Sequence, residues 1–271
     1  MSGFLLALRT SFGFLSTIPV GMSMEGLDEL VKRSYLQTFA GIVLGAMIGI
    51  FAYLTESFLP STISAVLIMV FIYYITGLNH LDGLGDFGDG ATAHGSLEKK
   101  VNALKDLSLG IGGVSYTVLA LIALYASISS LQAEVLFFSD NAALIVPISL
   151  LIAEISAKQA MLTLAAFGKP IHEGLGSMII NNTTFARYVV SFVLGALACV
   201  LAFGTLGIIG YISAIVTAFV ILNISNRHFK GINGDCIGTA NEIARIIVLM
   251  VLTVAITAVN NGYGGLFWMP L

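Results

Sequence analysis

Residues 77–90 combine three carboxylates and a histidine with several glycines, in a chain that carries few charges elsewhere. Asp82, Asp86 and Asp89 are four and three positions apart, so in a helix they share one face and are within reach of one metal ion. Clustered like charges repel one another unless a cation lies among them. Oxygen ligands suit a hard divalent ion such as Mg²⁺ or Mn²⁺, which keeps waters and substrate phosphates as its other ligands. The segment therefore predicts a metal site at Asp82, Asp86 and Asp89 that supports phosphoryl transfer at a membrane.

His80 lies two residues before the first aspartate. Its imidazole suits a general base for an attacking group, a hydrogen-bond partner of a ligand, or a polar side chain at the end of a membrane span. The sequence leaves these three roles open.

The composition predicts a polytopic membrane protein. Hydrophobic residues make up 57% of the 271 residues and charged residues 10%, compared with about 25% charged residues in soluble domains. Because a spanning helix needs about 20 apolar residues, we predict an all-α transmembrane bundle of about seven spans, in a single catalytic domain comprising residues 1–271. An interfacial or re-entrant helix is predicted before the first span, within residues 4–20, because Arg9 and Pro19 interrupt this apolar stretch. The predicted spans are 36–59, 62–78, 113–132, 142–166, 187–205, 207–225 and 243–259.

The basic residues predict the orientation of the bundle. All twelve Lys and Arg residues except Lys158 precede the first span or lie in alternate loops, and the loop 134–141 and the tail 260–271 contain none. Short cytoplasmic loops collect Lys and Arg. We therefore predict a multi-pass protein of the cell membrane whose N-terminus and polar loops are cytoplasmic and whose C-terminus is outside. This assignment counts Arg245, at the approximate start of the last span, with the loop before it.

Two features within the spans predict contacts between helices. Glu154 and Lys158 have the i, i+4 spacing of a helical ion pair, which either stabilises the bundle or lines an active cavity. Gly41, Gly45 and Gly49 recur every fourth residue and predict close helix packing.

A second polar segment, residues 223–242, mixes basic residues, glycines and two carboxylates. If the spans alternate as predicted, this segment and the aspartate segment face the same compartment. We expect the two segments to converge on one ligand.

The string His80-Leu81-Asp82-Gly83-Leu84, followed by Asp86 and Asp89-Gly90, resembles the cobalamin synthase family of adenosylcobinamide-GDP ribazoletransferases. Similar stretches at 14–20, 39–49, 105–113, 154–156, 174–176 and 234–242 extend the resemblance almost from end to end. The resemblance implies a membrane transferase that joins adenosylcobinamide-GDP to α-ribazole, or to its 5′-phosphate, and releases GMP. It also implies Mg²⁺ as the cofactor.

The resemblance implies roles for individual residues and partners. Asp82, His80 and Asp86 would be catalytic, and the first and third of these would bind the metal with Asp89. The corrinoid nucleotide, the α-ribazole substrate and membrane lipid are the expected partners, and nucleic acid is not expected. The resemblance is compatible with a homo-oligomer and with contacts to other cobalamin-pathway enzymes. The implied substrate-binding residues are Lys105, Asp106, Lys230, Asn233, Asp235, Glu242 and Glu154.

Two other functions are compatible with parts of the pattern. A CDP-alcohol phosphotransferase of lipid synthesis also uses clustered aspartates, and residues 86–94 begin its usual motif, but His94 replaces the expected arginine and the later aspartate pair is absent. An ion-coupled transporter would explain the charged pair at Glu154 and Lys158. Its polar residues would gather at the bilayer midplane, whereas here most of them lie in loops.

Overall fold

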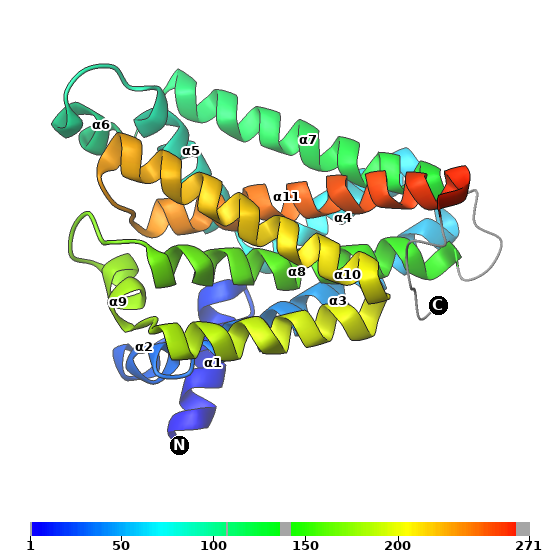
Figure 1. The fold of residues 1–271 in the computed structure, drawn as a ribbon, viewed down its shortest axis with the longest axis horizontal. Coiled ribbons are helices and arrows are strands. Elements are labelled where there is room, and N and C mark those ends of the chain that lie inside the picture. The colour runs from blue at the N-terminus through cyan, green and yellow to red at the C-terminus, as the bar shows by residue number, and fades with distance from the viewer. Residues whose placement is uncertain (1, 107, 136–141, 264–271) are drawn as a thin grey trace.

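The computed structural model describes residues 2–106, 108–135 and 142–263, and every regular element in these ranges is a helix (Figure 1). The all-α prediction is therefore confirmed. The elements are α1 (Gly3–Leu15), α2 (Met24–Val31), α3 (Tyr35–Phe58), α4 (Ser61–Thr76), α5 (Asn79–Thr92), α6 (Leu97–Ala103), α7 (Ile111–Val135), α8 (Ala142–Phe167), α9 (Leu175–Asn182), α10 (Phe185–Phe229), α11 (Gly234–Ala258) and a short π-helix (Val259–Tyr263).

Five helices, α3, α7, α8, α10 and α11, are long and apolar enough to cross a membrane, and α4 with α5 forms a sixth candidate that is bent by 96°. The 45-residue α10 is interrupted at Phe203 and Gly204, where the backbone leaves helical geometry. The Tyr211 hydroxyl donates to the Phe192 carbonyl oxygen at 3.0 Å, across this break. Helix α10 therefore folds back on itself as two antiparallel arms (Figure 1). The seven predicted segments correspond to α3, α4, α7, α8, the two arms of α10, and α11.

The bend between α4 and α5 occurs at Gly77, whose positive φ of 75° favours glycine. Helices α5, α6 and α9 gather at one end of the bundle, whereas the turn of α10 lies at the other end (Figure 1). The polar segments are thus brought together at one end, as the alternation of spans predicts.

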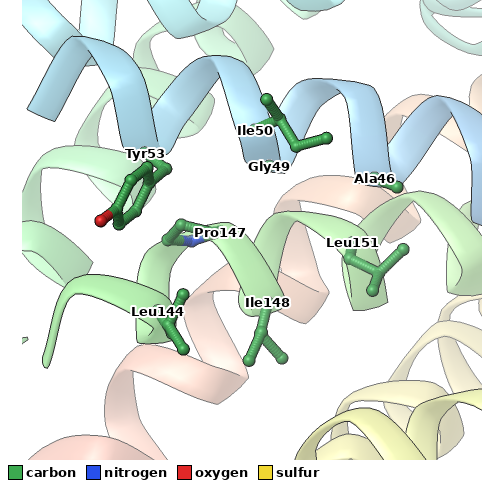
Figure 2. Close-up of a pocket in the computed structure, with 8 residues that line it drawn as sticks. All are labelled: Ala46, Gly49, Ile50, Tyr53, Leu144, Pro147, Ile148 and Leu151. Atoms are coloured by element: carbon green, nitrogen blue, oxygen red, sulfur yellow. The ribbon is translucent and has the colours of Figure 1, made fainter. Parts of the chain in front are cut away.

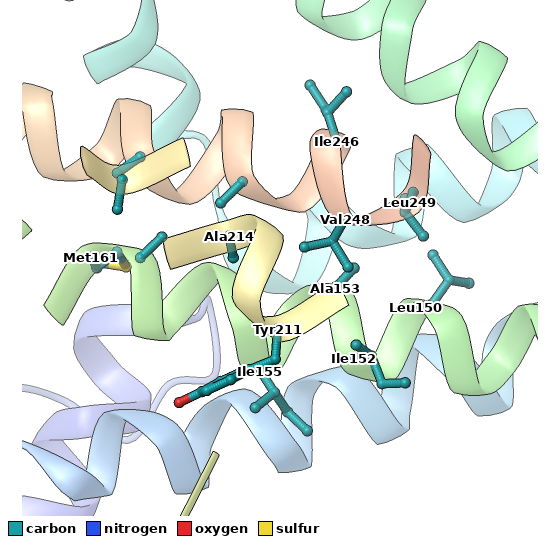
Figure 3. Packing of buried hydrophobic residues seen from close by; sticks show 14 of the residues in the cluster. Leu150, Ile152, Ala153, Ile155, Met161, Tyr211, Ala214, Ile246, Val248 and Leu249 are labelled. Atoms are coloured by element: carbon teal, nitrogen blue, oxygen red, sulfur yellow. The ribbon is translucent and has the colours of Figure 1, made fainter. Parts of the chain in front are cut away.

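Helix α8 is the most buried of the crossing helices and packs against α3, α10 and α11. Figure 3 shows its side chains meeting Tyr211 and Ala214 of α10 and Val248 and Leu249 of α11. On its other side α8 contacts α3 so closely that a Cβ atom at Gly49 would lie 2.7 Å from the Pro147 carbonyl oxygen. An apolar groove of about 290 Å³ accompanies this contact (Figure 2). The close packing predicted from the glycine spacing is confirmed.

The N-terminal boundary of the last predicted span is wrong. Helix α11 begins at Gly234, nine residues earlier than predicted, so Arg245 lies well inside a crossing helix and is buried. Hydropathy misses the turns before residue 243 because they contain Asp235 and Glu242. At the other end of the chain, the 13 residues of α1 span about 20 Å, which is shorter than the roughly 30 Å hydrocarbon core. The residues 136–141 and 264–271, used in the orientation argument, lie outside the described ranges.

Candidate active site

Helix α5 carries the predicted aspartates on one face. Asp82 is exposed and Asp86 and Asp89 are partly exposed, whereas His80 and Leu84 are buried on the other side of the helix. This division follows from the sequence, because residues two apart in a helix point in nearly opposite directions. The structure therefore brings the aspartates together and separates His80 from them.

Helix α11 adds a fourth carboxylate. A Cβ atom at Gly83 would lie 2.9 Å from the Asp235 Cα atom, and Thr239 donates to the Gly83 carbonyl oxygen at 3.2 Å. Asn233 caps α11 by accepting from Cys236 N at 3.1 Å, and its amide donates to an Asp235 oxygen at 2.5 Å. The first turn of α11 is thus held directly against α5.

The carboxylates interact electrostatically across this contact. Asp235, Asp82 and Asp89 all act on the Asp86 carboxyl group, and no basic side chain contributes to its environment in the described part of the chain. The site is therefore an acidic patch, in which Asp235 joins the three predicted aspartates.

Asp89 has hydrogen bonds of its own. Its two oxygens accept from Gly110 N at 2.7 Å and from Gly113 N at 2.8 Å, at the start of α7. Main-chain N–H groups at a helix start lack partners within the helix, and a carboxylate satisfies them well. Asp89 thereby attaches α7 to α5, and its predicted role as a metal ligand stays a prediction.

We expect the Asp89→Ala substitution to lower the free energy of unfolding by about 1–3 kcal/mol, because two main-chain donors lose a charged acceptor. Thermal or denaturant unfolding of the purified protein in detergent measures this loss. Asp106→Ala is the matched control, since the Asp106 carboxylate bonds a single main-chain N–H, that of Ser108, in an exposed loop. Equal stability of the two variants would contradict the assignment.

The second polar segment, residues 223–242, also pairs with the loop between α8 and α9. Ile232 N donates to the Lys169 carbonyl oxygen at 2.8 Å, and Ile171 N donates to the Ile232 carbonyl oxygen at 3.0 Å. This pairing places His172 close enough to act electrostatically on Asp235. The two polar segments lie against each other where Gly83 meets Asp235, and their convergence on one ligand stays a prediction. His172 is a neighbour of the site that sequence spacing does not reveal.

The other predicted substrate-binding residues of the loops surround this end of the bundle. Lys105 and Asp106 are exposed between α6 and α7, and Lys230 is exposed at the end of α10 in a left-handed conformation with φ of 63°. Their positions leave all three side chains free to meet a ligand from solution.

Glu154 and Glu242, which the resemblance assigns to substrate binding, lie instead in an internal ion cluster. Glu154 pairs with Lys158 at 2.5 Å and with Arg245 Nε at 3.0 Å, and Arg245 Nη1 also donates to both oxygens of Glu242 at 2.8 and 2.9 Å. All four side chains are at most 2% exposed. The predicted Glu154–Lys158 pair is confirmed, and Arg245 and Glu242 extend it to α11.

The ion cluster lies beneath α5. The Tyr73 hydroxyl, near the end of α4, donates to Glu242 at 3.0 Å. The buried His80 side chain is close enough to be influenced by the charges of Lys158, Glu242 and Arg245. His80 therefore faces this cluster and not the aspartates.

The acidic patch has a donor set that suits a metal shared with a substrate. Among the described residues, no three His, Cys, Asp or Glu side chains form a ready-made metal cage. Mg²⁺ is commonly held by one or two carboxylates together with water and substrate phosphates. Two carboxylates from the group Asp82, Asp86 and Asp235 would fit that kind of site, and none of the three forms an ion pair with a Lys or Arg among the described residues.

Comparison with known proteins identifies relatives along the whole chain. A family model described as cobalamin-5-phosphate synthase matches residues 7–253. A protein of Methanococcoides burtonii named adenosylcobinamide-GDP ribazoletransferase is 95% identical over 271 residues, covering all of both chains. A protein of the same name from Methanosarcina mazei is 52% identical, and the alignment covers all of both chains. Another from Pyrococcus abyssi is 33% identical, and the alignment covers 91% of this chain and 97% of the relative. No solved structure matches.

Proposed function

Because the chain belongs to the cobalamin-5-phosphate synthase family, we propose that it is a membrane-embedded transferase that joins adenosylcobinamide-GDP to α-ribazole or α-ribazole 5′-phosphate. In this reaction a hydroxyl group of the acceptor attacks the corrinoid-side phosphorus atom, and GMP leaves. The products are adenosylcobalamin or its 5′-phosphate, together with GMP. The CDP-alcohol phosphotransferase and transporter alternatives are not favoured, because the full-length relatives carry the corrinoid transferase name.

The observation that carries this proposal is the acidic patch where α5 meets α11. Asp82 and Asp86 belong to α5, and α5 lies at the same end of the bundle as α6 and the end of α10, which the exposed Lys105 and Lys230 follow (Figure 1). Carboxylates next to cationic side chains suit a diphosphate substrate, because a metal ion and the lysines can share its oxygens. A water-exposed patch also leaves room for the bulky corrinoid that carries the reacting phosphorus atom.

We propose that Asp82, Asp86 and Asp235 hold Mg²⁺. When bound, the ion would neutralise the negative charge of the diphosphate and of the departing GMP. The exposed Asp82 carboxylate would accept the proton of the attacking hydroxyl group. Lys105 and Lys230 would bind the phosphates of the nucleotide, with Asp106 and Asn233 at the edges of the same site. The buried His80 would orient α5 and not contact the substrate.

The position of the site also supports an orientation in the membrane. Lys99 belongs to α6, Lys169 lies between α8 and α9, and Lys230 follows α10, and these segments lie at the same end of the bundle as α5 (Figure 1). By the positive-inside rule this end would face the cytoplasm. We propose that the N-terminus and the site are cytoplasmic and that the C-terminus is outside.

GMP release by the purified protein in detergent tests this function. Adenosylcobinamide-GDP is supplied with α-ribazole or its 5′-phosphate, with and without Mg²⁺, and GMP and the corrinoid product are quantified by chromatography. We expect metal-dependent release of one GMP for each corrinoid product. If folded protein gives no turnover with either acceptor but releases CMP from a CDP-alcohol donor, the lipid-type function is correct instead.

A further inference from the structure

The buried ion cluster joins three helices just below the active site. Glu154 and Lys158 belong to α8, Glu242 and Arg245 belong to α11, and the Tyr73 hydroxyl reaches the cluster from α4. Two negative and two positive side chains make the cluster neutral. Asn241 completes it by accepting from Lys158 at 2.8 Å and donating to Glu242 at 2.8 Å.

Stability alone does not explain such a cluster. A buried ion cluster gains little over well-packed apolar side chains of similar size, because each charge has to be removed from water. This cluster is also incompletely satisfied, since Arg245 Nη2 is buried and has no hydrogen-bond partner among the described residues. What directional ion pairs do provide is a single relative placement of the elements that they join.

We propose that Arg245 is a positioning residue for the transfer reaction. Its guanidinium group holds Glu242 on its own helix and Glu154 on α8 at the same time, and thereby fixes where α11 lies. Asp235 and Gly238 are seven to ten residues before Arg245, about two to three turns along the same helix. Arg245 therefore determines, through α11, how Asp235 approaches the aspartates of α5.

Close contacts at the N-terminal end of α11 make the position of α5 depend on that of α11. A Cβ atom at Gly238 would lie 3.1 Å from the His80 Cα atom, and the one at Gly83 would lie 2.9 Å from Asp235 Cα. With backbones this close, a shift of α11 displaces α5 directly. The inference rests on the proposed function in one respect, since the site that is positioned is the one assigned to Mg²⁺ and the diphosphate.

The test compares Arg245→Lys with the double variant Glu154→Gln/Lys158→Met. Lysine keeps the charge but cannot reproduce the fork that contacts two carboxylates. The double variant removes the Glu154–Lys158 pair together with the bond from Arg245 Nε to Glu154, and it remains neutral because the Arg245–Glu242 pair is left in place. Tyr211→Phe is the control, because it deletes a buried hydrogen bond of α10 far from α5.

We expect Arg245→Lys to lower kcat by about 10-fold and to raise the Mg²⁺ concentration for half-maximal rate, because reacting groups lose their alignment. Hydrogen–deuterium exchange, measured without substrates, should increase in residues 79–92 and 234–242 and not in the arms of α10. The double variant should also lower kcat and raise exchange in the same residues, because it loses the bond that joins α11 to α8. Tyr211→Phe should lower Tm while kcat stays within about 3-fold of the wild type.

A merely structural cluster would give a different pattern. If kcat simply follows Tm across all the variants, or if Arg245→Lys leaves both kcat and the exchange of α5 unchanged, the proposal is wrong. If Arg245→Lys does not fold, Tyr73→Phe is the milder form of the test, and unchanged exchange and kcat in that variant would overturn the proposal. The exchange measurement needs no turnover, so it separates a failure of this inference from a failure of the proposed function.

Discussion

The Gly83→Leu variant is expected to release GMP about 100-fold more slowly than the wild type, and Gly83→Ala about 10-fold more slowly. The reason is the contact with α11, where even a Cβ atom would lie 2.9 Å from the Asp235 Cα atom. A backbone atom cannot rotate away as a side chain can, so α5 has to move. A displacement of about 1 Å is enough to cost about 100-fold in rate when reacting groups are held in place by the fold.

Gly234 provides the matched control for this experiment. It begins α11 close to the same contact, yet a Cβ atom at this position would meet nothing within 4 Å. Gly234→Ala and Gly234→Leu should therefore keep nearly full activity. Initial rates of GMP release at saturating substrates and Mg²⁺ measure both series. Equal losses at the two glycines would mean that the α5–α11 contact does not control the reaction.

The second large effect is expected at Asp86, which lies among the other carboxylates. We expect Asp86→Asn to lower the rate of GMP release by about 100- to 1,000-fold, the usual cost of removing one group that stabilises charge in a transition state. The same substitution should raise Tm in the absence of Mg²⁺, because it removes one of several mutually repelling charges near Asp235 and Asp82.

The Asp86 prediction is specific because it combines a lower rate of GMP release with a higher Tm. Asp28→Asn, on the exposed face of α2, is the control that changes net charge equally without touching the site. It should alter neither the rate nor the gain of stability on adding Mg²⁺. A drop in Tm for metal-free Asp86→Asn would show that this carboxylate is held by favourable contacts and is not part of a repulsive patch.

The sequence predicts those features of the active site that depend only on the spacing of residues along a helix or on the alternation of spans. The spacing of Asp82, Asp86 and Asp89 correctly places them on one helical face, and the i, i+4 spacing identifies the pair of Glu154 and Lys158. The alternation of spans correctly brings the polar segments to one end of the bundle. These features depend on local geometry, which a sequence shows directly.

The failures share one physical cause. A hydropathy profile assigns charged residues to water-exposed segments, so it places Glu242 and Arg245 in a loop, whereas both are buried in α11. Inside a bundle, charges on different helices can neutralise one another, and no local pattern reveals which partners will meet. The same limit applies to Asp89, whose partners at Gly110 and Gly113 lie more than twenty residues away.

The ion cluster has a consequence for how the chain is made. Helix α8 carries Glu154 and Lys158 one turn apart, and α11 carries Glu242 and Arg245 three residues apart, so each helix contains its own compensating pair. Each can thus leave the insertion machinery without a net charge to bury, even though more than seventy residues separate their synthesis. The bond from Glu154 to Arg245 forms later, when inserted helices associate. The placement of α11 against α8 is then completed within the lipid, by a contact that neither helix needs in order to enter it.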